Sequence, residues 1–455
     1  MSTAEGAGRS WWCELAWLGG PDATSGVLLE TGSGGRLARV TAGVAEAPPD
    51  AGALRGLTLP GLVNAHSHAF HRGLRGRTQT GGGSFWTWRE TMYALAGRLD
   101  PERYLALATA AYAEMVLAGI TTVGEFHYLH HDPSGRPYST DAMGEAIVEA
   151  AARAGIRLTL LDTCYLWGGI GREPDSVQRR FSDGIVGEWA RRVERLDEGP
   201  ELRVGAAVHS VRALDPGAIS VVASWAGERG APLHAHVSEQ PAENEACIAA
   251  YGLTPTALLA EQGALGGDFT AVHATHLDAG DLGLLGSSGS SVCFCPTTER
   301  DLADGIGPAG ELRAAGARLC LGSDSHAVVD LLEEARGVEL DERLATGRRG
   351  GHHPAELLAD ATARGAESLG WPGGGRLVPG SPADWCTLDT RHPCLAGTFG
   401  PSGAGAAAAV VFAGVAAAVT DVVVAGRPVV TGGRHVVIED PGAALAAAIE
   451  AAWGE

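Results

Sequence analysis

From about residue 59 onward, short β-type segments alternate with helical segments, and this alternation limits most strongly how the chain can fold. Eight β-type segments are apparent, at residues 57–68, 120–127, 157–165, 203–211, 232–239, 269–276, 291–298 and 318–325. The segments between them are punctuated as helices. In the first, Asp100 is a predicted N-cap, Pro101 takes the first helical position and Gly119 is the predicted C-cap. The pattern predicts an α/β fold, a closed (β/α)8 TIM barrel with reactive groups where strands end.

The two ends of the chain predict a second, smaller unit. Residues 1–58 and 377–455 contain hairpin-like patterns that are too short to form separate cores. Because both flank the predicted barrel, residues 59–376, we expect them to pair into one small β-sandwich domain. The uncharged stretch 403–420 is about long enough to span a membrane. It is rich in Ala and Gly and precedes a hairpin-like alternation, so it predicts short strands and packed turns.

The charged residues exclude several kinds of chemistry. The net charge is −20, and all 34 basic residues are arginines because the sequence contains no lysine. A phosphate-binding-loop lysine, a Schiff-base lysine and a carboxylated lysine bridging two metals are therefore impossible. The negative charge argues against nucleic acid and anionic membranes as partners. An anionic substrate would need arginine side chains supplied within its own pocket.

The chain start and the cysteines bear on the cellular compartment. The first 20 residues lack a basic segment followed by an uninterrupted apolar one, so we expect no signal peptide and a cytoplasmic protein. Eight cysteines are scattered along the chain, and the only close pair is Cys293 and Cys295. We interpret this pair as small buried strand residues, in preference to a disulfide or a metal site.

Histidines at strand ends predict a metal site. His66 and His68 end the first predicted strand, and alternate residues of a strand share a face, as two ligands of one metal require. For an H-x-H pair alone, a surface pair or two separately hydrogen-bonded histidines is the more common explanation. His236 at the end of the fifth strand and Asp324 at the end of the eighth complete it. Three imidazoles and a carboxylate suit one Zn²⁺ ion, with Fe²⁺ as an alternative.

Other strand-end residues predict hydrolysis. A divalent ion can lower the pKa of a bound water from 15.7 to about 7. We expect Glu239 to move protons to a leaving nitrogen, His273 to stabilise developing charge, and Asp324 both to bind the metal and to accept a proton. Each has a structural alternative: a salt bridge for Glu239, a hydrogen bond for His273, and a helix cap for Asp324. Their occurrence together at strand ends favours catalysis.

Four segments resemble the amidohydrolase superfamily, specifically its mononuclear aminohydrolase branch: LPGLVNAHSHAF (59–70), HAHVSEQ (234–240), VHATH (272–276) and LGSDSH (321–326). Further segments resemble one group within that branch and extend the resemblance over the barrel: FHRGLRGRT (70–78), SFWTWRETMY (84–93), GEFHYLHH (124–131), VHSVRAL (208–214) and CPTTERDLADG (295–305). The resemblance implies hydrolytic release of ammonia from an amidine-like carbon in a small dicarboxylate, and a homodimer.

The resemblance also implies which residues hold the substrate. Arg89, Tyr128, His209 and Arg212 match positions that hold it in this group, and guanidinium and phenol groups suit carboxylates. Members of the group often have glutamine soon after the H-x-H pair, where this chain has His71. We expect His71 to contact the substrate near the reacting carbon, so its identity bears on specificity.

Alternatives to this assignment remain open at the level of sequence. Arg89 can brace the aromatic residues around it, and Arg212 can pair with Asp215. The same barrel can act on a purine, a pyrimidine or a guanidino compound, which would favour aromatic stacking over arginine contacts. A non-catalytic carrier would keep the metal ligands without needing Glu239 or His273.

Overall fold

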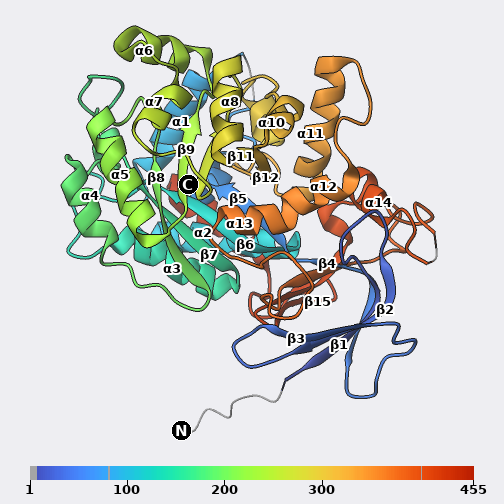
Figure 1. Cartoon of the computed structure of the whole chain (residues 1–455). Coiled ribbons are helices and arrows are strands. Elements are labelled where there is room, and N and C mark those ends of the chain that lie inside the picture. The colour runs from blue at the N-terminus through green and yellow to red at the C-terminus, as the bar shows by residue number, and fades with distance from the viewer. Residues whose placement is uncertain (1–7, 80–81, 401, 455) are drawn as a thin grey trace.

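The computed structural model describes residues 8–79, 82–400 and 402–454, which form two eight-stranded sheets (Figure 1). The first sheet is parallel, and its neighbouring strands follow sequence order. Its strands are β5 (Leu62–Ser67), β6 (Ile120–His127), β7 (Arg157–Cys164), β8 (Leu202–Val208), β9 (Leu233–Val237), β10 (Phe269–His273), β11 (Ser291–Phe294) and β12 (Arg318–Leu321). Each predicted β-type segment overlaps one of these strands, which confirms the (β/α)8 architecture.

The barrel closes where its first and last strands meet. Ser67 forms a parallel bridge with Asp324, and the Asp324 amide donates a 3.0 Å hydrogen bond to the His66 carbonyl. Asn64 extends the seam by donating to Ser323 Oγ at 2.7 Å. The closing contact therefore brings the predicted ligands of the first and eighth strands together.

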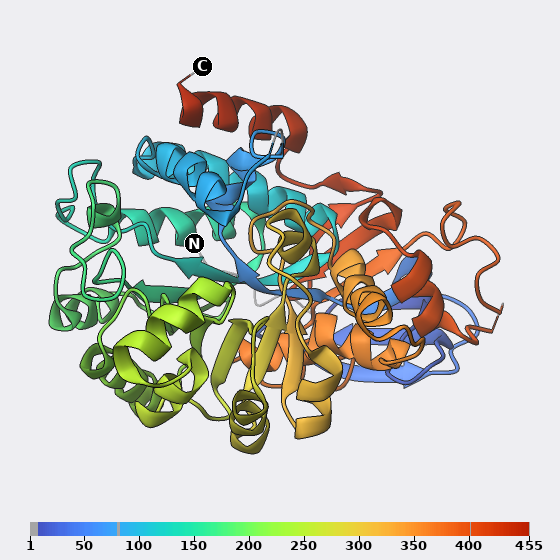
Figure 2. The same cartoon turned by 90° about the horizontal axis from the view of Figure 1, so that it is seen from above.

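Helices cover the outside of the barrel (Figure 2). They are α1 (Phe85–Ala96), α2 (Pro101–Leu117), α3 (Ala142–Ala154), α4 (Val186–Val193), α5 (Pro216–Arg229), α6 (Pro241–Tyr251), α7 (Pro255–Glu261), α8 (Ala279–Ser288), α9 (Pro296–Asp301), α10 (Ala309–Ala315), α11 (Leu331–Thr346), α12 (Pro354–Ala359) and α13 (Gly365–Ser368). Short 3₁₀ or π turns are η1 (Ala69–Leu74), η2 (Gln178–Arg180) and η3 (Asp360–Arg364). The Asp100 carboxylate caps α2 as predicted, by accepting from the Arg103 amide. Ala118 takes the C-cap position predicted for Gly119, and Gly119 follows it with φ 86°.

The second sheet joins both ends of the chain, as predicted for the small β domain. In spatial order its strands are β16 (Arg434–His435), β15 (Arg427–Thr431), β14 (Val419–Val424), β13 (Trp385–Leu388), β4 (Gly52–Pro60), β1 (Ser10–Ala16), β2 (Thr24–Thr31) and β3 (Leu37–Ala42). The two ends meet where β4 pairs antiparallel with β13, placing Leu57 opposite Leu388. Trp11 and Trp385 pack edge to face in its core, with ring centroids 5.0 Å apart.

The predicted first barrel strand, residues 57–68, is divided in the structure. Its first part belongs to β4 of the second sheet, and only β5 enters the barrel. The chain passes between the sheets at Gly61, where a Cβ atom would lie 2.0 Å from Thr121 Oγ1. Only glycine fits at this crossing. The crossing could not be predicted from sequence, because the apolar run continues through it without a break.

The C-terminal segment is more helical than predicted. Within residues 403–420, read from sequence as strands and turns, Ala406–Ala413 forms α14 and Ala416–Ala418 forms the short turn η4. The five alanines of α14 favour this helix. The tail then ends in α15 (Pro441–Trp453), which packs on α2 (Figure 2). The Trp453 indole donates a hydrogen bond to the Gly73 carbonyl in η1. Among the described residues, no helix is both long and apolar enough to cross a membrane.

Candidate metal centre and active site

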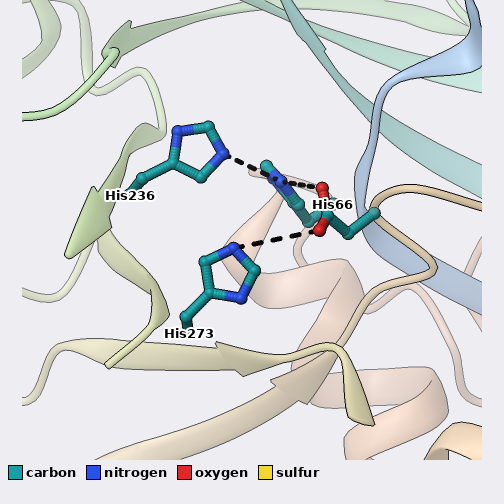
Figure 3. A group of neighbouring side chains, drawn as sticks. His66, His236 and His273 are labelled. Carbon is teal, nitrogen blue, oxygen red and sulfur yellow. Dashed lines mark hydrogen bonds and ion pairs between the residues drawn. The ribbon is translucent and has the colours of Figure 1, made fainter. Parts of the chain in front are cut away.

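Four of the predicted ligands converge where the barrel closes. Nε2 of His66 lies 3.2 Å from Asp324 Oδ1 and 3.3 Å from His236 Nε2, and Nε2 of His68 lies 3.4 Å from the same Asp324 oxygen. Figure 3 shows His236 and His273 pointing toward His66 from neighbouring strands. All these side chains are buried. Donor atoms around a tetrahedral ion with bonds of about 2.1 Å lie roughly 3.4 Å apart, so the spacing fits a single ion.

The hydrogen bonds behind two ligands set their tautomers. His68 Nδ1 lies 2.9 Å from the Phe126 carbonyl, and His236 Nδ1 lies 2.9 Å from the His209 carbonyl. A carbonyl can only accept, so Nδ1 carries the proton and Nε2 presents a lone pair to the site. Oriented and neutral imidazoles of this kind are suited to binding a cation.

The charge states of the cluster agree with this arrangement. Burial, together with the neighbouring histidines, holds the pKa of His68 and of His236 well below the usual value. Burial would raise the pKa of Asp324, but its hydrogen bond to His66 and the nearby imidazoles hold it well below its usual value. Neutral nitrogen donors around one ionised carboxylate match the donor set of a divalent metal.

Backbone strain marks the same strand ends. His273 has φ 67° and Asp324 has φ 41°, in the left-handed region that residues with a Cβ atom rarely adopt. Such conformations persist where surrounding structure enforces them, and they concentrate at functional sites. Here they turn both side chains from the strand ends toward the shared centre.

His273 is held among three carboxylates. Its Nε2 lies 3.8 Å from Glu239 Oε1 and 3.9 Å from Asp324 Oδ2, while its Nδ1 lies 3.4 Å from Glu299 Oε1. Burial opposes the imidazolium, but the carboxylates outweigh it and raise the pKa of His273 to about 10. Burial also raises the pKa of Glu239. The pair therefore provides a charged hydrogen-bond donor beside a carboxyl group suited to exchanging protons.

All the predicted catalytic and substrate-binding residues line one pocket. They are His71, Arg89, Tyr128, His209, Arg212, Glu239, His273 and Asp324. Aromatic side chains dominate the remainder of the wall: Phe85, Trp86, Trp88, Tyr93, Tyr165, Trp167 and Phe181. The pocket thus extends from the cluster of predicted metal ligands along an apolar wall, on which the arginine side chains are separate positive charges.

The two predicted arginines are held differently. The Arg212 guanidinium lies 3.4 Å from buried Glu243, so the alternative partner Asp215 is not the one it adopts. Arg89 lies over the Trp86 ring at 4.5 Å and over the Tyr93 ring at 5.4 Å, which matches the aromatic bracing that sequence left open. Stacking and pocket lining coexist for Arg89, because a guanidinium can present its edge while its face packs on a ring.

His71, Tyr128 and His209 form the wall next to the ligands. His71 Nε2 lies 3.0 Å from the Tyr128 hydroxyl, and the His71 and His68 ring centroids are 4.5 Å apart. His209 packs edge to face on Tyr165 at 4.6 Å. His71 therefore contacts both the pocket-lining Tyr128 phenol and the predicted metal ligand His68.

Sequence reasoning did not single out three residues of this site. Arg172, in the loop after β7, lines the pocket as a third guanidinium. Tyr165 and Glu299 contact His209 and His273. Glu299 could have been found from sequence, because it lies within the segment CPTTERDLADG that carries the family resemblance. Arg172 lies in a loop without a regular pattern and offered no such signal.

The remaining histidines and cysteines have structural surroundings. His234 Nε2 lies 3.0 Å from the Ser368 carbonyl. His130 and His131 lie in the loop after β6 and are buried. Cys293 and Cys295 are buried free thiols in the barrel interior, which confirms their interpretation as small apolar residues.

Comparisons with known proteins agree with this geometry. The amidohydrolase family model matches residues 57–429. The chain is 40% identical over 411 residues to the formimidoylglutamate deiminase of Pseudomonas aeruginosa, covering 86% of this chain and 90% of that protein. It is 30% identical over 392 residues to the 8-oxoguanine deaminase of the same organism, covering 84% and 85%.

Solved structures give the same picture. An amidohydrolase from Brucella melitensis superposes with a TM-score of 0.88 at 32% identity, covering 98% of this chain and 99% of that one. An adenosine deaminase from Xanthomonas campestris with bound zinc superposes with a TM-score of 0.84 at 22% identity, covering 97% of each chain, and shares the fold. By its fold, its donor set for one divalent metal and its similarity over most of its length, the chain belongs to the amidohydrolase family.

Proposed function

We propose that this chain is a zinc-dependent deiminase that converts N-formimino-L-glutamate and water into N-formyl-L-glutamate and ammonia, a reaction of histidine degradation. The relative that is 40% identical carries the name of this activity. The observation that supports it most strongly is the combination, in one pocket, of the His and Asp cluster with Arg89 and Arg212. The substrate has an amidine carbon for the cluster and two carboxylates for the arginines.

In this proposal His66, His68, His236 and Asp324 hold the metal. When bound, the metal supplies Lewis-acid activation of water near neutral pH. The carbonyls behind His68 and His236 keep both imidazoles oriented. Asp324, ionised in the cluster, accepts the first proton as water attacks the amidine carbon.

Two residues manage the remaining charge and protons. His273, protonated between its carboxylates, donates a hydrogen bond to the attacking oxygen and stabilises charge that develops during attack. Glu239 carries a proton to the departing nitrogen, and the raised pKa of its carboxyl group suits this transfer. The carbon–nitrogen bond breaks, ammonia leaves and the formyl group remains on glutamate.

The substrate is oriented by the cationic points of the pocket. Arg89 at the aromatic wall and Arg212 near Glu243 each bind one carboxylate, and Tyr128 and His209 fill the space between these and the metal. Charge-assisted hydrogen bonds of this kind offset the unfavourable net charge of −20 at short range.

A second candidate is an aminohydrolase that acts on a purine or another planar base. The aromatic wall around Trp88 and Tyr165 favours it, because flat rings stack on aromatic side chains. A neutral base would leave the Arg89 guanidinium, which contacts the rings of Trp86 and Tyr93, without an anionic partner, and this favours the dicarboxylate.

The experiment is an ammonia-release assay with the zinc-loaded chain. N-formimino-L-glutamate is compared with its analogue that lacks the side-chain carboxylate, and with guanine and adenosine. We expect efficient release only from the dicarboxylate. Turnover of a base with no release from N-formimino-L-glutamate would select the second candidate, and release from none by a metal-replete chain would contradict both.

A further inference from the structure

A second group of metal-binding side chains lies outside the barrel interior, behind the active site. It consists of His127, the last residue of β6, His130 in the following loop, and Asp141, the N-cap of α3. Each is at most 4% exposed, and one candidate ligand atom from each lies within 4.8 Å of the others. The Phe126 ring contacts His236, so strand alternation turns His127 to the opposite side of β6, where it faces Tyr104.

The hydrogen bonds of this group leave its facing atoms unpartnered. His130 Nε2 lies 2.9 Å from the Thr163 carbonyl, which can only accept, so Nε2 carries the proton and Nδ1 holds a lone pair. Among the described residues, that Nδ1 atom, His127 Nε2 and both carboxylate oxygens of Asp141 have no hydrogen-bond partner. His127 Nδ1 lies 3.4 Å from the Tyr104 hydroxyl, and when it donates there, its Nε2 holds a lone pair as well. Buried acceptors without a donor are costly, and a cation relieves that cost.

The nearest arginine does not meet this need. Arg192 uses Nη1 for Asp162 at 2.5 Å, and Nε and Nη2 for the two oxygens of Asp183 at 3.0 and 2.8 Å. It stays 4.0 Å from Asp141. His131, 3.2 Å from Asp183, is the other potential cation. Asp141 is thus the one of these three carboxylates to which Arg192 donates no hydrogen bond.

We propose that His127, His130 and Asp141 form a second metal site, distinct from the active site, that binds Zn²⁺. Two imidazole nitrogens and a carboxylate with both oxygens free supply up to four donor atoms of the types that zinc prefers. The ion would pair with the Asp141 carboxylate, to which Arg192 donates no hydrogen bond. It would tie the end of β6, the following loop and the start of α3 together, and so fix the backbone of the adjacent pocket residue Tyr128. Its role is structural, and the active-site metal does not depend on it.

The test counts zinc in the full chain after chelator treatment, reloading with Zn²⁺ and removal of excess metal. Elemental analysis is expected to give about two equivalents per chain, and about one in either H127Q/H130Q or H66A/H236A. The matched control is H435Q. His435 is a buried histidine whose Nε2 lies 3.0 Å from the Ala154 carbonyl, and whose Nδ1 accepts from two backbone amides. H435Q should keep both ions.

If a proton or a water molecule occupies the His127, His130 and Asp141 group in place of a metal, the metal equivalents differ from those above. One equivalent in wild type and in H127Q/H130Q, with none in H66A/H236A, would overturn the proposal. Where H127Q/H130Q does not fold, D141N serves as the milder variant and should also lose one ion. As a second readout, Zn²⁺ should raise the thermal midpoint of H66A/H236A, because a ligand that binds only the folded state stabilises it. That shift should disappear when D141N is added, and its absence from H66A/H236A itself would count against the second site.

Discussion

Nε2 of His66 lies 3.3 Å from Nε2 of His236, although the two histidines stand 170 residues apart in the chain. Nε2 of His236 carries no proton, because Nδ1 of the same ring donates to the His209 carbonyl. A bare lone pair directed at a second imidazole beside the ionised Asp324 is an arrangement that a shared cation stabilises.

His236→Ala should therefore remove the active-site metal and, with it, turnover. We expect the variant to lose one metal equivalent and kcat/KM to fall by a factor on the order of 10³ or more, because Lewis-acid activation contributes several kcal/mol. Metal content and ammonia release are measured together, with H435Q as the control. Normal turnover in a variant that has lost this ion would contradict the assigned ligands.

The alternation of strands and helices was sufficient to predict the barrel, because a period of two followed by helix caps is a local signal. The candidate ligands could also be predicted, since they stand at strand ends and the fold brings strand ends together. The division of residues 57–68 at Gly61 could not, because it depends on the contact with Thr121, which is distant in sequence. Arg172 was missed for the same reason: a loop residue reaches a pocket through tertiary structure.

Glu239→Gln should separate proton transfer from binding. The amide keeps nearly the same shape but cannot exchange protons, so kcat should fall about 10²- to 10⁴-fold while KM and metal content stay near wild type. Steady-state kinetics with elemental analysis provides the measurement. A variant that binds metal and substrate and turns over normally would indicate that another group transfers the proton.

Arg89→Ala should weaken binding of the dicarboxylate selectively. A charge-assisted hydrogen bond contributes about 1.5–3 kcal/mol, which corresponds to a rise in KM of roughly 10- to 100-fold. The matched control is R153A, since Arg153 is an exposed arginine that pairs with Glu149 on α3. Arg172→Ala measures whether the third guanidinium contributes. Equal KM values for wild type and R89A would support the purely bracing role of Arg89 over Trp86 and Tyr93.

His71→Gln introduces the glutamine that the family resemblance implies at this position. The His71 ring lies 3.0 Å from the Tyr128 hydroxyl, and an amide can form the same hydrogen bond. We expect H71Q to retain kcat/KM within about threefold, and H71L to lose roughly two- to tenfold, the worth of one neutral hydrogen bond. Assays with N-formimino-L-glutamate and its monocarboxylate analogue measure both rate and specificity. A loss in H71Q as large as that in H71L would show that the imidazole itself is required.

Glu243 gives a pH dependence of stability whose sign can be tested. Its side chain is fully buried, and burial raises its pKa to about 7 despite the Arg212 charge. Between the usual carboxyl pKa of 4.5 and this value, the folded state holds a proton that the unfolded state has lost. The contribution of Glu243 to the free energy of unfolding must therefore fall as pH rises through this window, and level off above it. The E243Q variant cannot titrate at this position. The unfolding free energy of wild type minus that of E243Q should therefore fall by about 3 kcal/mol from the lower to the upper end of this pH window. Urea unfolding of both proteins across that range is the measurement. The constant effect of leaving Arg212 without a charged partner cancels from the pH slope, and parallel stability curves would mean that Glu243 keeps an ordinary pKa in the folded protein.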